Sequence, residues 1–311
     1  MLYRDYESVS KLINNDTVIA IGNFDGIHYG HKQVLSKAQR FAEEKGLPFI
    51  IITFEPHPNI CMRGKHTHKR VLCLREKINK LKEFKPSFIL AQRFNNKFAS
   101  ISAEDFIQKI LVEKLKVLHL VVGYDFVFGK GRRGNIDFLS TMATYYGFYL
   151  DVIEKITVKN QICSSTTLRQ YLSLGQIQEV NNLLGNNYSI SGVVKEKNNF
   201  DDELEVKTVN LNNIDNLALR YGIYLGKVEI KGQDKKLPAI IHYGLPINQI
   251  KLNKELCKIH ILDKTVEDLY KKEVKIEIEQ FIRPEMLFDS LKELKEQTIK
   301  DIQFALYYFK L

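Results

Sequence analysis

The sequence of 311 residues has no apolar run near the roughly 20 residues that a membrane-spanning helix needs. Its first residues, Met1–Glu7, lack the apolar stretch of a secretory signal. Its four cysteines form no CxxC pair, so neither a zinc knuckle nor a disulfide framework is indicated; they are Cys61, Cys73, Cys163 and Cys257. We therefore expect a cytoplasmic protein that does not bind membranes.

Motifs of nucleic-acid binding are absent too, since there is no recognition-helix pattern, RNP motif or arginine-rich tract. The net charge is nevertheless +9. Of 46 basic and 37 acidic residues, 20 of each lie in residues 187–311, which leaves 26 basic and 17 acidic residues in residues 1–186. A positive first half suits an anionic nucleotide, although a lysine-rich solvated surface gives the same count. We expect small nucleotides rather than nucleic acid as partners.

The length is sufficient for two domains that each bury a core, and no internal repeats are found. In the first half, short β-branched runs alternate with segments of helical period, such as Lys32–Ala42 and a helix that Ser102–Asp105 opens as a capping box and that runs through Leu115. The predicted strands are Thr17–Ile21, Phe49–Phe54, Phe88–Leu90, His119–Gly123 and Tyr149–Ile153. This alternation predicts an α/β domain: a parallel sheet with helices on both faces, which binds ligands at the carboxyl ends of its strands.

The second half favours an antiparallel β-barrel followed by a terminal helix. Its predicted strands are Ser189–Lys195, Tyr221–Ile230, Leu237–Tyr243, Leu256–Leu262 and Val274–Phe281, with a turn at Lys231–Asp234. The terminal helix has apolar residues at helical spacing, namely Leu291, Leu294, Ile299, Ile302 and Leu306. The polar stretch Gly185–Tyr188 predicts a domain boundary, so the domains comprise residues 1–186 and 187–311.

The strongest chemical signal is the segment Gly22–His31, which reads Gly-Asn-Phe-Asp-Gly-Ile-His-Tyr-Gly-His between a predicted strand and a predicted helix. Glycines let a backbone approach a ligand closely, and a helix N-terminus offers N–H groups and a partial positive charge to phosphates. His28 and His31 are three residues apart and therefore share one face near that helix end. Their imidazoles can donate hydrogen bonds to phosphate oxygens during a transfer reaction.

Two further segments allow either a functional or a purely structural interpretation. In Ser164–Arg169, hydroxyls and N–H groups can bind phosphate and Arg169 can reach it one turn later, or the segment is an ordinary N-cap followed by a surface arginine. In the loop after the fourth strand, Phe126 and Phe128 offer a stacking surface beside Asp125, or they are core aromatics.

Five motifs, in order and spacing, resemble those of the prokaryotic bifunctional riboflavin kinase/FAD synthetases, whose first domain is a Rossmann-like, HIGH-type nucleotidyltransferase. The motifs are Gly22–His31, Phe54–Pro58, Phe94–Ala99, Gly123–Gly134 and Cys163–Arg169. The resemblance covers residues 15–186 and extends to a riboflavin kinase barrel in residues 187–311. It implies an FMN adenylyltransferase in the first domain, with ATP and FMN as substrates, Mg²⁺ assisting and pyrophosphate released. The sequence itself identifies no metal ligands.

The resemblance also implies roles for individual residues. As catalytic residues around the ATP phosphates it implies His28, His31, Ser164 and Arg169. As further ATP-binding residues it implies Gly22, Phe24, Asp25, Gly26, Gly30 and Thr166. As flavin-binding residues it implies Phe54, His57, Pro58, Asp125, Phe126 and Phe128, although His57 is equally compatible with a structural turn.

The second domain departs from the family pattern where the kinase chemistry lies. Thr208 and Asn210 remain of the Pro-Thr-Ala-Asn motif, but Lys207 replaces its proline, and asparagine and aspartate residues replace the preceding glycines. Lys258 stands where the family has its catalytic glutamate. Because a lysine is protonated at neutral pH, it cannot act as that base. We therefore expect weak or absent kinase activity and a barrel that serves as a structural or flavin-binding module.

Four functions remain open at this level. The first is FMN adenylyl transfer with a degenerate kinase domain, and the second is a fully bifunctional enzyme that also phosphorylates riboflavin. The third is a nucleotidyltransferase for another phosphorylated acceptor, which the aromatic loop Asp125–Phe128 disfavours. The fourth is a flavin- or nucleic-acid-binding module without turnover, which the retention of His28, His31, Ser164 and Arg169 disfavours.

Overall fold

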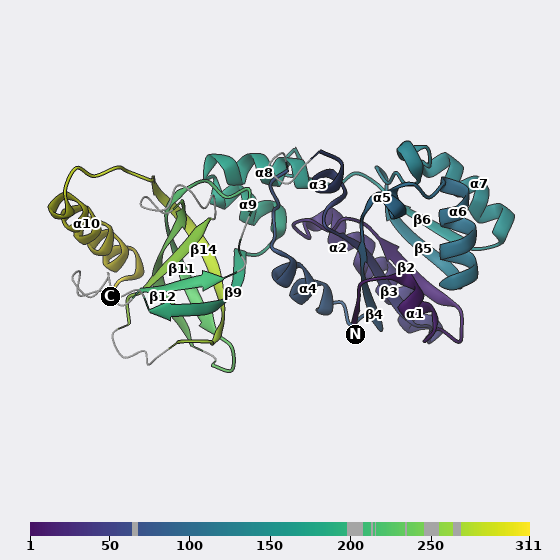
Figure 1. Ribbon diagram of the computed structural model, residues 1–311, viewed down its shortest axis with the longest axis horizontal. Helices are drawn as coiled ribbons and strands as arrows, with labels where there is room; N and C mark the ends of the chain where they lie inside the picture. The colour runs from purple at the N-terminus through teal and green to yellow at the C-terminus, as the bar shows by residue number, and fades with distance from the viewer. Residues whose placement is uncertain are drawn as a thin grey trace. The chain divides into compact units, whose positions relative to one another are not determined.

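The computed structural model describes residues 1–63, 68–197, 208–212, 214, 216–233, 235–245, 255–263 and 269–311. The chain divides into two compact units (Figure 1). The first unit comprises Met1–His68 and Lys77–Ser165, and the second comprises Lys69–Glu76 and Thr166–Leu311. The division at residue 186 expected from the sequence falls between helix α9 (Ile177–Leu184) and strand β9 (Tyr188–Lys197) and stays a prediction.

The first unit is built on a six-stranded sheet whose neighbouring strands are all parallel, in the order β1-β4-β3-β2-β5-β6. The strands are β1 (Leu2–Tyr3), β2 (Thr17–Ile21), β3 (Phe49–Glu55), β4 (Phe88–Arg93), β5 (Val117–Gly123) and β6 (Tyr149–Ile153). The chain runs outward from β2 to β3 and β4, then returns to β5 on the other side of β2. The carboxyl end of β2 therefore lies at the point where the strand order reverses, the usual ligand site of such sheets.

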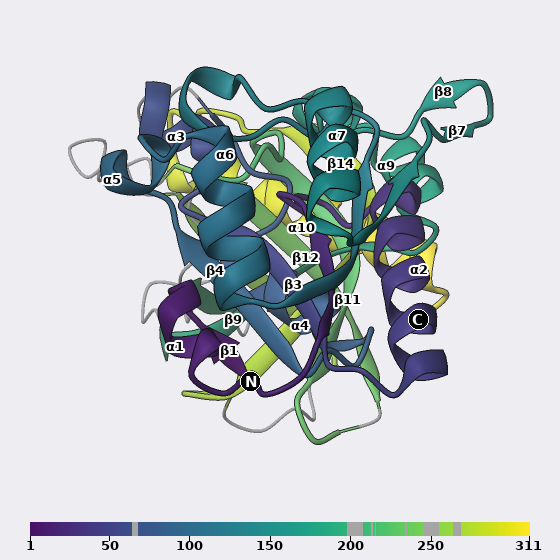
Figure 2. The ribbon, with the colours of Figure 1, turned by 90° about the vertical axis from the view of Figure 1, so that its right-hand side faces the viewer.

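Helices cover both faces of this sheet, as the sequence predicts. Helix α2 (Tyr29–Lys45) packs on one face through its buried apolar residues and ends at Gly46, which adopts a left-handed conformation. Figure 2 shows α2 on the opposite side of the sheet from α6 (Ala103–Asp105) and α7 (Ile136–Tyr146). The other helices and short strands of the unit are α1 (Tyr6–Ser10), α3 (Pro58–Arg63), α4 (Leu74–Lys82, which begins in the second unit), α5 (Asn96–Ala99), η3 (Lys130–Arg132), β7 (Thr157–Val158) and β8 (Gln161–Ile162).

The helix expected from Ser102 to Leu115 differs from the prediction in its hydrogen bonding. Ser102 caps its first turn by accepting the N–H of Asp105, and Ala103–Asp105 form α6. Residues Phe106–Lys114 (η2) are instead a π-helix, in which Leu115 N–H donates to the carbonyl of Ile110. The buried residues fall in pairs, at 106 and 107 and at 110 and 111. This apolar spacing is compatible with an α-helix and with a π-helix, so it does not distinguish them.

The second unit is a closed antiparallel barrel with the strand order β10-β13-β12-β11-β14-β9, which confirms the predicted fold class. Its strands beyond β9 are β10 (Thr208–Asn212), β11 (Gly222–Ile230), β12 (Lys236–Gly244), β13 (Leu256–Ile261) and β14 (Glu273–Pro284). Strand β10 was not predicted, because its sequence Thr-Val-Asn-Leu-Asn has few apolar residues. Of the predicted turn Lys231–Asp234, Asp234 lies outside the described residues.

Helix α8 (Ser165–Leu174) and α9 lead into the barrel, and α10 (Leu291–Phe309) follows it. The terminal helix is confirmed, but only part of its predicted apolar set packs on the barrel: Ile302 lies against the cluster that contains Ala305. Leu291 and Ile299 are more than half exposed, whereas Asp301 and Ala305 are buried. Asp301 is buried because it pairs with Arg283 of β14, at 2.6 Å from Nη2 and 3.0 Å from Nε. An apolar-period pattern cannot identify a packing face that carries a buried ion pair.

Candidate nucleotide and flavin sites

The loop between β2 and α2 is tightly constrained by its sequence. Phe24, Gly26 and Ile27 have φ angles of 48°, 105° and 47°, in the left-handed region that side chains other than glycine rarely adopt. Phe24 is nevertheless buried at 1% exposure, so the packing of its ring holds the loop. A Cβ atom at Gly22 would lie 3.0 Å from that ring. Position 22 therefore requires a glycine because the Phe24 ring packs directly against its backbone.

The structure brings His28 and His31 together at the start of α2. His28 is the N-cap residue, and its Nδ1 accepts the backbone N–H of His31 at 3.3 Å. The two rings stack with centroids 3.7 Å apart and planes 19° apart, and the edge of Phe24 packs against His31 at 5.3 Å. A Cβ atom at Gly30 would lie 3.1 Å from the His28 ring. The glycine of the His-x-Gly-His motif therefore makes room for the first imidazole.

Both imidazoles are neutral at neutral pH. Burial lowers the pKa of His28 to about 4. Burial, with smaller contributions from His28 and Lys77, lowers the pKa of His31 well below its ordinary value. Because Nδ1 of His28 accepts a hydrogen bond, the ring proton is on Nε2, which is a donor. Nδ1 of His31 is buried and makes no hydrogen bond within the described part of the chain.

The remaining predicted ATP-binding residues divide between the two compact units. Asp25 is buried, and its backbone carbonyl accepts the hydroxyl of Ser165 at 2.6 Å, within the first unit. Ser164 precedes α8 and belongs to the first unit, whereas Thr166 and Arg169 lie on α8 within the second. The grouping of Ser164, Thr166 and Arg169 with the histidines around one triphosphate therefore stays a prediction.

Three of the six predicted flavin residues belong to one aromatic cluster of the first unit. Phe126 and Phe128 stack at 5.3 Å, and Phe128 also lies 5.5 Å from Phe106. Phe54 joins the cluster through Phe98, at 6.0 Å. The cluster comprises Phe54, Phe94, Phe98, Phe106, Phe126, Phe128 and Phe138. Phe54 and Phe128 are buried, so only the less buried members offer surface to a ligand.

The other flavin candidates differ in exposure. Asp125 is exposed, next to the partly buried Phe126. His57 is buried and stacks on His68 at 4.1 Å, and its Nδ1 accepts the N–H of Asn59 at 3.2 Å. Pro58, which is half-buried, begins α3. These contacts place His57 in a helix-start turn, which is the structural role that the sequence left open for it.

Sequence reasoning missed Lys77, a buried lysine at the carboxyl ends of β2 and β3. Its Nζ donates to Thr53 Oγ1 at 3.1 Å and to the carbonyls of Asn23 and Phe54 at 3.4 Å each. Only 5% of this residue is exposed. One signal was available: Lys77 follows Leu74 by three residues and precedes Ile78 and Leu81, so it lies on the apolar face of its helix.

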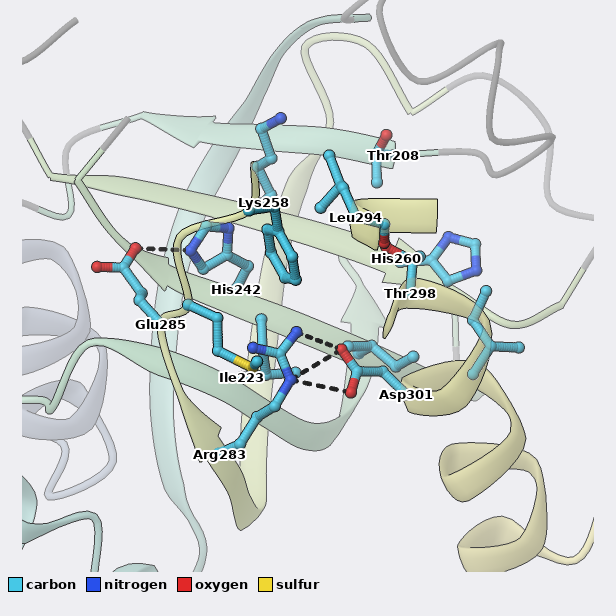
Figure 3. Close-up of a pocket in the computed structure, with 14 residues that line it drawn as sticks. Thr208, Ile223, His242, Lys258, His260, Arg283, Glu285, Leu294, Thr298 and Asp301 are labelled. Atoms are coloured by element: carbon cyan, nitrogen blue, oxygen red, sulfur yellow. Dashed lines mark hydrogen bonds and ion pairs between the residues drawn. The ribbon is translucent and has the colours of Figure 1, made fainter. Parts of the chain in front are cut away.

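The second unit has a cavity of about 180 Å³ between the barrel and the residues around α10 (Figure 3). Its lining includes Thr208, Lys258, the ion pair Arg283–Asp301 and the hydrogen-bonded pair His242–Glu285, the latter at 2.8 Å. Asn210 pairs directly with Lys258 across β10 and β13. The structure therefore brings together the three kinase-domain residues predicted from the sequence. Lys207 and the segment that replaces the glycine-rich loop lie outside the described residues.

Two oxygens of this site are candidate ligands for a metal. Thr208 Oγ1 and Asn210 Oδ1 are buried and accept no hydrogen bond from the described residues. Neutral oxygens of this kind fit a hard cation such as Mg²⁺. In the described part of the chain, no group of three histidine, cysteine or acidic residues is placed to hold a metal ion. Within that same part, no helix combines the length and apolarity needed to cross a bilayer.

Comparisons with known proteins agree with both units. Residues 10–167 match the FAD synthetase family model, and residues 184–309 match that of riboflavin kinase. The bifunctional riboflavin kinase/FMN adenylyltransferase of Buchnera aphidicola subsp. Schizaphis graminum is 34% identical, covering 97% of this chain and 96% of that protein. Its Escherichia coli K12 counterpart is 32% identical, covering 100% and 98%. A crystal structure described as a macrolide-efflux protein from Streptococcus pneumoniae has a TM-score of 0.78 at 25% identity and covers 98% of both chains.

The riboflavin kinase match does not support the expectation that kinase activity is weak or absent. That expectation rested on single positions, whereas the match extends over 184–309. Both domains are thus present in one chain. The two bifunctional relatives named above align over nearly its whole length. The chain belongs to the family of bifunctional riboflavin kinase/FMN adenylyltransferases.

Proposed function

We propose that the first unit makes FAD by transferring the adenylyl group of ATP to FMN. The observation that carries this proposal is the pair of neutral, stacked imidazoles at the N-terminus of α2, at the carboxyl end of β2. Such a helix end offers backbone N–H groups to phosphates. The aromatic cluster around Phe126 supports a flavin rather than another phosphorylated acceptor.

In the proposed reaction, a phosphate oxygen of FMN attacks the α-phosphorus of ATP. The bond between that phosphorus and the oxygen bridging to the β-phosphorus breaks, and pyrophosphate leaves with the electron pair. His28 donates from Nε2 to a phosphate oxygen while its Nδ1 accepts the His31 N–H, so its orientation is fixed before ATP binds. No covalent intermediate on the protein is required, and positioning supplies much of the acceleration.

Mg²⁺, when bound, neutralises charge on the transferred and leaving phosphates. The described residues of the first unit provide no cluster of metal ligands, so we infer that the triphosphate itself carries the ion to this site. In the second unit, Thr208 Oγ1 and Asn210 Oδ1 fit as ligands. We assign Ser164, Thr166 and Arg169 to the ATP phosphates by their match to the family motif.

Riboflavin phosphorylation is the second candidate activity, and the riboflavin kinase match together with the Thr208–Asn210 oxygens favours it. Lys258 lines the same cavity at the position where the sequence pattern calls for a carboxylate base. Without that base the ribityl hydroxyl must be deprotonated by another group. The fully bifunctional enzyme and the adenylyltransferase with a slow kinase thus differ only in the rate of riboflavin phosphorylation.

Incubating the protein with ATP and Mg²⁺ plus either FMN or riboflavin, followed by chromatography of the flavins, tests the proposed function. FAD formed from FMN supports adenylyl transfer, and unchanged FMN at high protein concentration would refute it. FAD formed from riboflavin requires both activities. Salt-sensitive binding of generic DNA without any FAD would instead indicate a binding module.

The Lys258→Glu variant tests the kinase assignment, because it restores the carboxylate of the family pattern. We expect FMN formation from riboflavin to rise by roughly 10²-fold, the lower range for general-base catalysis, with FAD formation from FMN unchanged. Lys292→Glu, an exposed change of the same charge on α10, is the matched control. An unchanged kinase rate in Lys258→Glu would show that position 258 does not limit the reaction.

A further inference from the structure

Lys77 occupies a point where three segments of the first unit converge. Its Nζ reaches the carbonyl of Asn23 in the loop after β2, and the hydroxyl of Thr53 and the carbonyl of Phe54 on β3. Thr53 Oγ1 also donates to the Asn23 carbonyl, at 2.9 Å. The ammonium group and the hydroxyl therefore bind the same carbonyl and join the loop to the neighbouring strand.

The position of Asn23 connects this network with the imidazoles. Asn23 immediately precedes Phe24, whose ring packs edge-on against His31. Phe24 itself has a φ angle of 48°, a conformation that persists only when the surroundings enforce it. Fixing the Asn23 carbonyl therefore fixes the strained residue against which His31 rests. A lysine buried this deeply gives up its hydration, and hydrogen bonds to protein oxygens take the place of water.

Burial of a cation here has no evident gain for stability alone. Burying an ammonium group costs desolvation free energy, and hydrogen bonds to neutral oxygens offset that cost only in part. The hydrogen bonds of Lys77 described above go to the end of β3 and the loop after β2, at the carboxyl ends of the strands, where sheets of this kind bind ligands. A role in ordering the nucleotide loop accounts for both the charge and its location.

We propose that Lys77 is a positioning residue for adenylyl transfer, which holds the loop Gly22–His31 against β3 so that the two imidazoles face the triphosphate. This inference rests on the proposed function of the same site. It assigns Lys77 no contact with ATP or flavin. Its loss should therefore misplace the imidazoles without removing any group that touches the substrate.

Lys77→Met tests the proposal, since it keeps the length of the apolar stem and removes the ammonium group. We expect kcat for FAD formation to fall about 10²-fold, the cost of a small misplacement of catalytic groups, while KM for ATP changes less than about threefold. The matched control is Lys82→Met, an exposed lysine of the same helix, which should retain wild-type kcat. Thr53→Val removes the shared hydroxyl at constant shape and should lower kcat about tenfold.

A second readout separates positioning from a general loss of structure. Burial lowers the pKa of His31 most, and the nearby His28 and Lys77 lower it further. Removing the ammonium group of Lys77 should therefore raise this pKa, which NMR titration of the ring measures. Wild-type kcat in both Lys77→Met and Thr53→Val would overturn the inference. If Lys77→Met does not fold, Thr53→Val provides the test. A tenfold lower kcat with an unchanged unfolding temperature would support the inference, and a wild-type kcat would overturn it. An inactive wild-type protein would refute the proposed function instead, which distinguishes the two failures.

Discussion

At the residue scale, the proposed nucleotide site depends on the burial of His28 and Lys77, which are 6% and 5% exposed. The spacing of His28 and His31 is sufficient to predict that they meet at a helix start, and they do. Their neutrality depends on side chains from elsewhere in the fold, which spacing does not show. Lys77 escaped sequence reasoning because a single lysine on an apolar helix face is usually a residue whose head reaches solvent.

The low pKa of His28 predicts a loss of stability in acid. Since its pKa is about 4 in the folded state and 6.5 in the unfolded state, the unfolded state binds more protons between these values. The stabilisation is complete above pH 6.5 and is lost as the pH falls toward 4, by about 3 kcal/mol. His28→Asn keeps a side-chain acceptor for the His31 N–H but does not titrate.

Unfolding free energies of the wild type and of His28→Asn, measured from pH 7 to pH 4, check this prediction. The wild type should lose about 3 kcal/mol more than the variant over that range. Parallel pH profiles of the two proteins would show that folding does not lower the pKa of His28.

At the element scale, strands were easier to predict than helix packing. The ranges Thr17–Ile21 and Tyr149–Ile153 were predicted to the residue, the first as a fully buried run and the second as a partly buried run rich in aromatic and β-branched residues. The short polar strand β10 was missed, since its place in the barrel comes from pairing with β9 and β13. The π-helix η2 and the buried Asp301 of α10 likewise depend on tertiary contacts.

The loop after β5 offers a paired test of how an element shapes the proposed flavin site. Gly129 and Gly131 have φ angles of 73° and 65°, but only at Gly129 would a Cβ atom lie 2.7 Å from the backbone of Ala103. Gly131→Ala should therefore cost only the conformational penalty of about 1 kcal/mol. Gly129→Ala should cost about 3 kcal/mol or more, because the backbone has to move as well.

Thermal unfolding and FMN titration of both variants measure this difference. We expect a clearly lower unfolding temperature and weaker FMN binding for Gly129→Ala, with near-normal FMN binding for Gly131→Ala. Equal effects of the two substitutions would contradict a tight contact between the loop and Ala103.

At the scale of the whole molecule, the sequence was sufficient for the fold class of both units and for the family, because several ordered motifs and two distinct strand patterns point the same way. It was not sufficient for the activity of the second unit. Lys258 and Thr208 line one cavity there, but the rate of kinase chemistry depends on geometry that residue identities do not specify. The excess of nine positive charges in residues 1–186 accords with a triphosphate ligand bound in that part of the chain.

The most direct test of adenylyl transfer follows the label of ATP into the product. With FMN and ATP labelled at the α-phosphorus, the account predicts labelled FAD and unlabelled pyrophosphate, and His31→Ala should form that FAD at least about 10²-fold more slowly. With ATP labelled at the γ-phosphorus, the FAD should carry no label. Label from the γ-position in the flavin product, or α-label that stays with ATP while FMN is consumed, would contradict it.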